Sequence, residues 1–289
     1  MDKDSLRATI IDGKAIAEKI RQDMAVQIST LLKDNHKPHL AVVLVGENPA
    51  SLVYIRHKEK ACQDVGMGFS LVKMPQDSTL SQVVSMVQKL NNDPQVTGIL
   101  VQQPLPAHID PHPVVLAVDP KKDVDCLHPS NLGLLAVGKG VVAPCTPQGV
   151  ITLLKSVAPD LKGKHAVIVG RSHIVGKPMA HMLLQEDATV TICHSHTKNL
   201  QEICRQGDIL VAAVGQPQLI TGDFIKTGAI VVDVGINRSA NGRLCGDVDF
   251  NQALLKAAHI TPVPGGVGPM TIATLIANCV AMCKNQKGC

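Results

Sequence analysis

The only tyrosine of the chain, Tyr54, stands four residues before Lys58 in a segment that reads as a helix. At this spacing the two side chains leave the same helix face, one turn apart. A phenol beside an ammonium can hydrogen-bond to it and, in a desolvated site, favour the neutral amine that accepts protons. The pair predicts acid–base chemistry, with an ordinary surface contact as the alternative.

Three more polar side chains, those of Gln102, Asp123 and Asp125, are candidates for a binding site. Gln102 closes the run Gly98–Gln102, which reads as a buried strand, and ligand sites in open α/β sheets lie beyond the carboxyl ends of strands. Asp123 and Asp125 are two residues apart, so in an extended segment both carboxylates would face one side, towards a metal or a heterocycle. The alternatives are that Gln102 caps loop backbone and that the aspartates form a solvated turn.

A glycine-containing turn, Gly170–Gly176, follows an apolar run and opens a helical pattern. Such a turn lets a phosphate approach the backbone, and the helix N-terminus favours the anion, although the strict G-x-G-x-x-G spacing is absent. About twenty residues on, where NAD-binding folds carry an acid, the segment Cys193–Lys198 has none. Together with Arg171 it indicates a site for the 2′-phosphate of NADP. His194 and His196 lack a third ligand, so a metal is not expected.

The stretch Thr261–Thr271 holds three prolines and three glycines directly before a helical pattern. Proline fixes the backbone angle φ, and glycine allows backbone conformations that other residues rarely adopt. The stretch therefore reads as a loop of defined shape rather than a linker. It predicts one wall of a binding site, with tight packing between domains as the alternative.

The elements that position these residues alternate between strands and helices. Short β-branched runs indicate buried strands, and apolar periodicity with caps such as Asn48–Pro49 indicates helices. This alternation implies right-handed βαβ units and a parallel sheet, hence an α/β fold. The first set is predicted as helix 13–33, strand 40–45, helix 49–66, strand 69–73, helix 80–90 and strand 98–102.

A second set of elements begins after Pro144, and about 150 residues per domain predicts two domains for this length. The final helix, 271–284, is apolar on nearly every side, so we expect it to be buried and to pack back on the first domain. The second set is predicted as helix 146–157, strand 165–169, helix 175–184 and strands 189–193, 209–214 and 229–234.

The composition excludes several classes of function. Lys plus Arg number 28 against 24 Asp plus Glu, and no stretch concentrates the charge, so no nucleic-acid or anionic-membrane partner is expected. With no Trp, one Tyr and three Phe, the chain is a poor candidate for stacking on single-stranded bases. The apolar stretch Met270–Cys283 is too short for a bilayer, and the N-terminus lacks a signal-peptide core. Nine cysteines without a C-x-x-C pair indicate free thiols and a cytoplasmic protein.

Taken together, these segments closely resemble the bifunctional methylenetetrahydrofolate dehydrogenase/methenyltetrahydrofolate cyclohydrolase family. Order, spacing and length agree over nearly the whole chain. The matching segments are Ile11–Lys14, Val45–Ser51, Tyr54 with Lys58, Val101–Gln102 before Pro104–Pro106, Lys122–Asp125, Pro144–Pro147, Gly170–Ser172, Asp233–Asn237 and Pro264–Thr271.

The resemblance implies an N-terminal βαβ catalytic, folate-binding domain, residues 1–145 completed by 270–289, and a Rossmann-type NADP-binding domain, residues 146–269. It implies oxidation of 5,10-methylenetetrahydrofolate with NADP, followed by hydrolysis of the methenyl product to 10-formyltetrahydrofolate. The folate would lie in a cleft between the domains, and such enzymes are commonly homodimers through the cofactor domain.

By motif, the resemblance assigns Lys58 as the catalytic base and acid, Tyr54 and Gln102 as the residues that tune and position it, and Asp125 as the holder of the pterin edge. The folate site would comprise Tyr54, Val101, Gln102 and Asp125, with a wall of Pro264, Gly265, Gly266, Val267, Gly268, Pro269, Met270 and Thr271. The NADP contacts would be Gly170, Arg171, Ser172, Ser195 and Ile236.

Two positions depart from the family pattern. Cys126 stands where Gly commonly follows the second Asp, and Gln103 replaces a usual Leu; both could adjust affinity near the pterin. An insertion typical of the NAD-using mitochondrial branch is absent from Leu183–Thr189, which favours the NADP type. As alternatives, a monofunctional dehydrogenase would lack Lys58, and a non-catalytic folate- or nucleotide-binding regulator would show damaged catalytic positions.

Overall fold

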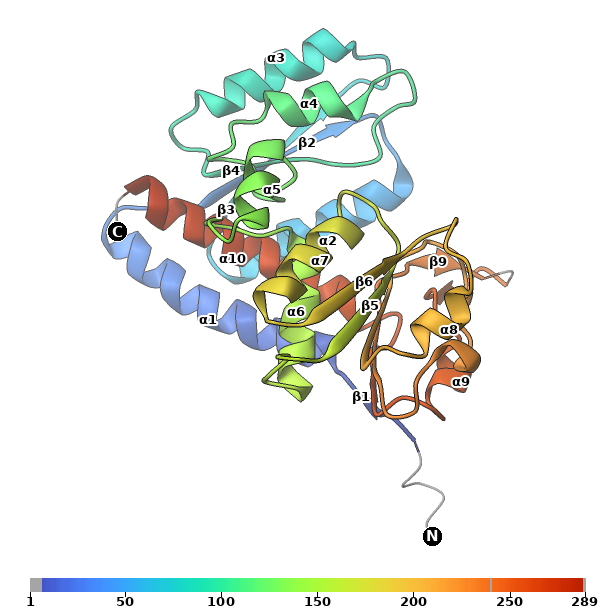
Figure 1. Cartoon of the computed structure of the whole chain (residues 1–289). Coiled ribbons are helices and arrows are strands. Elements are labelled where there is room, and N and C mark those ends of the chain that lie inside the picture. Colours follow the sequence, from blue (N-terminus) through green and yellow to red (C-terminus); the bar gives the residue numbers. More distant parts are fainter. Residues whose placement is uncertain (1–6, 240, 288–289) are drawn as a thin grey trace. The chain divides into compact units, whose positions relative to one another are not determined.

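The computed structural model describes residues 7–239 and 241–287, which form two compact units (Figure 1). One unit holds the described residues up to Ala17 together with Thr146–Thr271, and the other holds Glu18–Cys145 together with the described residues from Ile272. The N-terminal segment differs from the expected domain 1–145, because strand β1 (Thr9–Ile10) pairs in parallel with β11 (His259–Ile260) in the sheet of the first-named unit.

The unit that contains Glu18–Cys145 is a three-layer α/β structure. Its elements are α1 (Gly13–Lys33, from Glu18 onward), β2 (His39–Val45), α2 (Pro49–Asp64), β3 (Gly68–Met74), α3 (Leu80–Asn91), β4 (Gly98–Val101), α4 (Pro111–Ala117), α5 (Pro129–Ala136) and α10 (Val267–Lys287, from Ile272 onward). The strands are parallel in the order β3-β2-β4, and helices cover both faces (Figure 1). Leu40 enters the core shared with α1, α2 and α10, whereas Ala41 enters the core shared with α3 and α4. Alternate side chains of β2 therefore fill two cores, as in a strand that is buried on both faces.

Helix α2, which carries Tyr54 and Lys58, begins as the sequence predicts. The Asn48 side chain accepts hydrogen bonds from the backbone N–H groups of Ala50 (3.0 Å) and Ser51 (3.1 Å), and Pro49 takes the first helical position. This N-cap satisfies donors that have no partner inside the helix. The cap fixes where the helix starts and hence how far along it Lys58 lies.

The other unit is a parallel six-stranded sheet in the order β1-β11-β8-β7-β5-β6. Its further elements are α6 (Cys145–Val157, from Thr146 onward), β5 (His165–Val169), α7 (Gly176–Gln185), β6 (Thr189–Cys193), α8 (Leu200–Cys204), β7 (Ile209–Ala212), a short 3₁₀ turn (Gly222–Phe224), β8 (Ile230–Asp233), the ribbon β9 (Asn237–Arg238) and β10 (Leu244–Cys245), and α9 (Phe250–Ala253). The strand order reverses beside β5, because β6 lies on one side of it and β7 on the other. Open α/β sheets bind nucleotides at the carboxyl ends of the strands that flank such a reversal.

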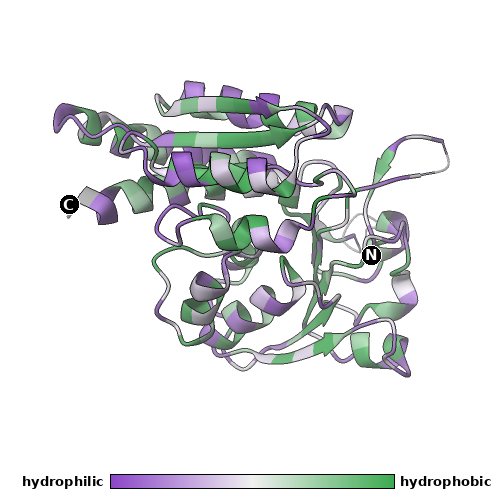
Figure 2. Cartoon of the chain, turned by 90° about the horizontal axis from the view of Figure 1, so that it is seen from above, coloured by the Kyte–Doolittle hydropathy of each residue, from purple (hydrophilic) through white to green (hydrophobic). Residues whose placement is uncertain are grey.

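The predicted βαβ organisation is confirmed in both units. Several strands are mostly hydrophobic, and the helices carry both hydrophobic and hydrophilic residues (Figure 2). The elements that the sequence did not predict are short, because two to eight residues give too little periodicity to read. They are β1, β9, β10, β11, α4, α5, α8 and α9.

Helix α10 begins at Val267, four residues before the predicted start, so Pro269 lies in its first turn, where a missing N–H costs no helical hydrogen bond. From Ile272 the helix fills the core of the three-stranded unit with Leu275, Ile276 and Cys279, as predicted. The helix is longer than the stretch Met270–Cys283, and by length and composition alone Val267–Gln286 could cross a membrane. With 61% of that stretch buried, a core helix accounts for its hydrophobicity.

Candidate active site

Lys58 and Gln102 meet between helix α2 and the end of strand β4. The Nζ atom of Lys58 donates a hydrogen bond to Oε1 of Gln102 over 2.9 Å. The amide is itself fixed, because Gln102 is buried and its Nε2 donates to the backbone oxygen of Gln103 over 2.7 Å. Tyr54 lies one turn before Lys58 and is 39% exposed; within the described residues no hydrogen bond joins the two. The structure thus pairs Lys58 with Gln102, while Tyr54 stands free beside them.

The charge state of Lys58 depends on its surroundings. Burial lowers the pKa of its ammonium, and the nearby carboxylate of Asp125 opposes that shift, as do the thiols of Cys145 and Cys62 more weakly. Burial likewise raises the pKa of Asp125, and the charge of Lys58 opposes it. Because desolvation favours the neutral form of both groups, the Lys58 ammonium loses its proton more readily than an exposed lysine does.

The two aspartates of the Lys122–Asp125 segment have different environments. Asp123 is buried, and its Oδ2 accepts hydrogen bonds from the backbone N–H of His128 (2.7 Å) and from Nδ2 of Asn131 (2.9 Å). Asp123 therefore holds the following loop, and Asp125 is the carboxylate that interacts with Lys58. Among the described residues the two carboxylates therefore have different partners, although the charge of Asp123 also acts on Asp125. No group of three metal-ligating side chains occurs in the described part of the chain.

Cys145 is a member of this cluster that the sequence did not single out. Its buried thiol hydrogen-bonds to Asp125, and burial, reinforced by that carboxylate, raises the pKa of the thiol well above its usual range. The thiol therefore stays protonated and serves as a donor. The Pro144–Pro147 motif marked this position, but a lone cysteine carries no signal for a role. The eight cysteines that the structure describes are free thiols.

The predicted cofactor residues gather at the carboxyl ends of β5 and β6. Gly170 has φ of +124°, and a Cβ there would lie 2.1 Å from the oxygen of Ala213, so only glycine fits this turn. Ser172 Oγ accepts from the backbone N–H groups of Val175 (3.1 Å) and Gly176 (3.4 Å) and thereby stabilises the turn before α7. Arg171 is exposed. The pKa of His194 is lowered first by desolvation of that imidazole and then by the positive charge of Arg171. Arg171 therefore lies near the loop after β6, which carries His194.

This arrangement fits a dinucleotide with a 2′-phosphate. The turn brings backbone to the start of a helix, and Arg171 and Ser195 supply exposed donors where an acid would repel the phosphate. Ile236 follows β8 at the same edge of the sheet and is 50% exposed, which gives an apolar surface for a ring.

The loop that carries Ile236 is held by two buried carboxylates. Asp233 accepts hydrogen bonds from the backbone N–H groups of Gly235 and Asp247, both over 2.9 Å. Asp247 accepts from the N–H groups of Val214 (2.6 Å) and Gly215 (3.0 Å), which follow β7. The sequence showed Asp233 only as part of a motif. Its role is to fix the loops at the cofactor edge.

The Pro264–Thr271 stretch belongs to the six-stranded unit, whereas Lys58, Gln102 and Asp125 belong to the other. Pro264, Gly265 and Gly266 form a turn, and Val267–Thr271 form the start of α10. Gly266 is confined, since a Cβ there would lie 2.6 Å from the oxygen of Pro262. The stretch predicted as a loop is therefore a turn over its first three residues and helix over the other five.

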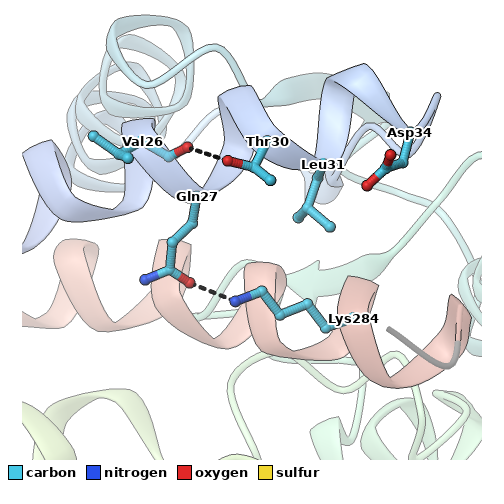
Figure 3. A pocket seen from close by; sticks show the side chains of 6 residues that line it. All are labelled: Val26, Gln27, Thr30, Leu31, Asp34 and Lys284. Carbon is cyan, nitrogen blue, oxygen red and sulfur yellow. Dashed lines mark hydrogen bonds between the residues drawn. The ribbon is translucent and has the colours of Figure 1, made fainter.

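Two surface depressions lie in the three-stranded unit. A groove of about 740 Å³ runs over the carboxyl ends of β2 and β3, and one of its walls is Pro104–Pro106, two residues after the site residue Gln102. A smaller pocket of about 390 Å³ lies between α1 and α10, where Nζ of Lys284 donates to Oε1 of Gln27 over 2.7 Å (Figure 3). The smaller pocket shares no residue with the Lys58 cluster.

Comparison with known proteins gives the family. The tetrahydrofolate dehydrogenase/cyclohydrolase catalytic-domain model matches residues 11–125, and the NAD(P)-binding-domain model of the same family matches residues 144–287. The chain belongs to the tetrahydrofolate dehydrogenase/cyclohydrolase family. As a member it is an oxidoreductase and a hydrolase: it oxidises 5,10-methylenetetrahydrofolate to the methenyl form and hydrolyses that product to 10-formyltetrahydrofolate.

Relatives in the family cover almost all of this chain. The bifunctional protein FolD of Agathobacter rectalis is 50% identical over 277 residues, which are 96% of this chain and 99% of that protein. The crystal structure of FolD from Campylobacter jejuni has a TM-score of 0.94 at 46% identity and covers 96% of this chain and 99% of its own. FolD from Trypanosoma brucei, in complex with NADP and an inhibitor, has a TM-score of 0.93 at 38% identity, with 98% and 99% covered.

Proposed function

We propose that one cluster of side chains in the three-stranded unit serves both reactions, with Lys58 as the group that transfers protons and NADP as the cofactor. The observation that carries this proposal is the hydrogen bond from Lys58 to the anchored amide of Gln102, beside the carboxylate of Asp125. The folate-binding part would be residues 1–145 completed by 270–289, less the N-terminal residues that join the other sheet.

Oxidation requires the one-carbon bridge of the folate to be held in a fixed place. When bound, NADP accepts the hydride that leaves this carbon. The carboxylate of Asp125 can accept two parallel N–H bonds from the aminopyrimidinone edge of the pterin. Val101 adds an apolar contact, and the half-exposed ring of Tyr54 offers a flat surface one turn before Lys58. The protein's contribution to this step is orientation, which lowers the entropic part of the barrier.

Hydrolysis requires a group that accepts a proton from water. The water oxygen attacks the methenyl carbon, and neutral Lys58 takes one proton of that water at Nζ. This proton then passes to the ring nitrogen as its bond to the carbon breaks, and the remaining hydroxyl proton is released to solvent as the formyl C=O forms. A neutral amine suits this role, since an ammonium would repel the methenyl cation. Burial lowers the pKa of Lys58 in the required direction, and Gln102 Oε1 holds Nζ in place.

The choice of NADP over NAD is supported by side chains at the end of β6 and the start of α7. Arg171 and Ser195 are exposed donors, and Gly170 and Ser172 shape the turn that would hold the phosphates. The Trypanosoma brucei relative is a complex with NADP.

We also propose that the protein is a cytoplasmic homodimer. Strand β6 is an edge strand of the six-stranded sheet and exposes 39% of Ile192, a feature of surfaces that pair with a second copy. Eight free thiols suit a reducing compartment. Light scattering should give twice the chain mass of 30.6 kDa, and a mass equal to one chain would contradict the dimer.

The assignment of Lys58 is tested with Lys58→Met, which keeps the aliphatic stem and removes the amine. Lys60→Met is the matched control, since Lys60 lies on the same helix with its side chain 76% exposed. Hydrolysis of supplied methenyltetrahydrofolate should fall by about 10²–10⁴-fold in the first variant and stay at the parent rate in the second. With folding verified by circular dichroism, hydrolysis at the parent rate by Lys58→Met would remove Lys58 from the mechanism.

A further inference from the structure

Asn278 is a buried amide in the middle of α10, and its neighbours Leu275 and Cys279 on that helix belong to the hydrophobic core. It is only 6% exposed. Burial of an amide costs free energy unless hydrogen bonds replace those it made with water. For packing alone, an apolar residue at this position would therefore cost less free energy. The partners of Asn278 therefore show what the amide does there.

Both partners of the amide group lie on segments that carry site residues. Nδ2 of Asn278 donates to the backbone oxygen of Val124 over 2.9 Å and to that of Ala143 over 2.8 Å. It also lies 3.5 Å from Sγ of Cys145. Val124 immediately precedes Asp125, and Ala143 lies two residues before Cys145. One amide thus ties the two segments together.

The same two segments are linked a second time by Cys145. Its thiol lies 3.6 Å from the backbone oxygen of Val124 and hydrogen-bonds to the carboxylate of Asp125. The segment before Asp125 and its carboxylate are therefore held by Asn278 of α10 and Cys145, the first residue of α6. Lys58, on α2, interacts electrostatically with the same carboxylate.

We propose that Asn278 is a positioning residue of the folate site, which fixes the carboxylate of Asp125 with respect to Lys58 through its bonds to Val124 and Ala143. This inference rests on the proposed roles of Asp125 and Lys58. Asn278 touches neither the pterin nor the reacting carbon; it acts through the segment before Asp125. A change at Asn278 should therefore affect folate binding and the titration of Lys58, beyond any effect on stability.

The expected titration change follows from the groups that face Lys58: Asp125, the thiols of Cys145 and Cys62, and the amide of Gln102. The carboxylate of Asp125 in turn faces Lys58, Asp123 and Cys145. Among these groups the charge of Asp125 opposes the fall in the pKa of Lys58 most strongly. If Asp125 moves away, the pKa of Lys58 falls further, so the acid limb of the cyclohydrolase pH profile shifts to lower pH.

The test compares Asn278→Leu, which has a similar volume and no donors, with Val280→Ala, a control that loses core packing on the same helix while keeping the amide. We expect Asn278→Leu to raise KM for methenyltetrahydrofolate roughly tenfold and to move the acid limb to lower pH, with KM for NADP changed less than about twofold. Val280→Ala should lower Tm and change neither KM nor the pH profile.

If Asn278→Leu does not fold, Asn278→Ala replaces it in the same comparison. The inference is overturned if the Asn278 variant matches Val280→Ala in both KM and pH profile. That outcome differs from a failure of the proposed function, in which Lys58→Met would hydrolyse methenyltetrahydrofolate at the parent rate. If Lys58 proves essential and the Asn278 variant leaves folate KM unchanged, only the role of Asn278 is rejected.

Discussion

The Nζ atom of Lys58 donates a 2.9 Å hydrogen bond to Oε1 of Gln102, and the other end of that amide donates to the backbone of Gln103. The position of the amine is therefore set by two elements, helix α2 and the end of strand β4. An amine on a helix alone would keep the freedom of its four-carbon stem. The anchored amide removes that freedom and holds the nitrogen where a proton must be taken.

Replacement of Asp125 by alanine should weaken folate binding strongly and leave NADP binding nearly unchanged. The carboxylate lies in the three-stranded unit, and the predicted NADP contacts lie in the six-stranded unit. Loss of charged hydrogen bonds to the pterin is worth about 1.5–3 kcal/mol or more, a tenfold or larger fall in affinity. Isothermal titration with a folate analogue and, separately, with NADP measures both. Equal losses would indicate a folding defect.

Arg171→Ala should lower affinity for NADP more than affinity for NAD. The guanidinium is exposed beside the loop after β6, where it can bind a 2′-phosphate that NAD lacks. Comparison of kcat/KM for the two cofactors in parent and variant gives the difference. If the parent already uses NAD as well as NADP, the assignment of the 2′-phosphate site is contradicted.

The carboxyl of Asp233 should make stability depend on pH. Burial raises its pKa to about 6 from an ordinary 3.8, although its backbone hydrogen bonds oppose the shift. Because the folded chain binds this proton more tightly than the unfolded chain, the contribution to stability is complete below about pH 4 and is lost as the pH rises through 6. Two pKa units correspond to about 3 kcal/mol.

Asp233→Asn does not titrate, so the Tm of the parent minus that of the variant should fall as the pH rises from 4 to 6.5. Circular dichroism is the suitable signal, since the chain has no Trp. Asp223→Asn, at an exposed position in the same unit, is the control for loss of an aspartate as such. A flat difference for Asp233→Asn would contradict the raised pKa.

Much of the fold could be predicted from the sequence because its signals are local. The apolar run of β2 and the Asn48 cap of α2 each lie within a few neighbouring residues, and the structure confirms both. The start of α10 was misplaced because Pro269 and its glycines are typical of loops, although proline is also tolerated in a first turn.

The site was only partly predictable. The spacing of Tyr54 and Lys58 is local, and the ends of parallel strands meet at one edge of a sheet, so these signals are visible in the sequence. The role of Asn278 depends on a bond to Val124, a residue 154 positions away in the chain, and no pattern of neighbouring residues encodes that contact. The different roles of Asp123 and Asp125 also depend on contacts outside the motif, because His128 and Asn131 donate hydrogen bonds to the carboxylate of Asp123.

The central claim is that one chain performs both reactions and that Lys58 is required for the second. The most direct test follows NADPH and methenyltetrahydrofolate together by absorbance after parent or Lys58→Met is mixed with methylenetetrahydrofolate and NADP. We expect the parent to form NADPH with little methenyl intermediate, and Lys58→Met to accumulate about one methenyltetrahydrofolate for each NADPH. If Lys58→Met forms NADPH without accumulating the methenyl compound beyond the parent level, Lys58 does not separate the two steps and the account is contradicted.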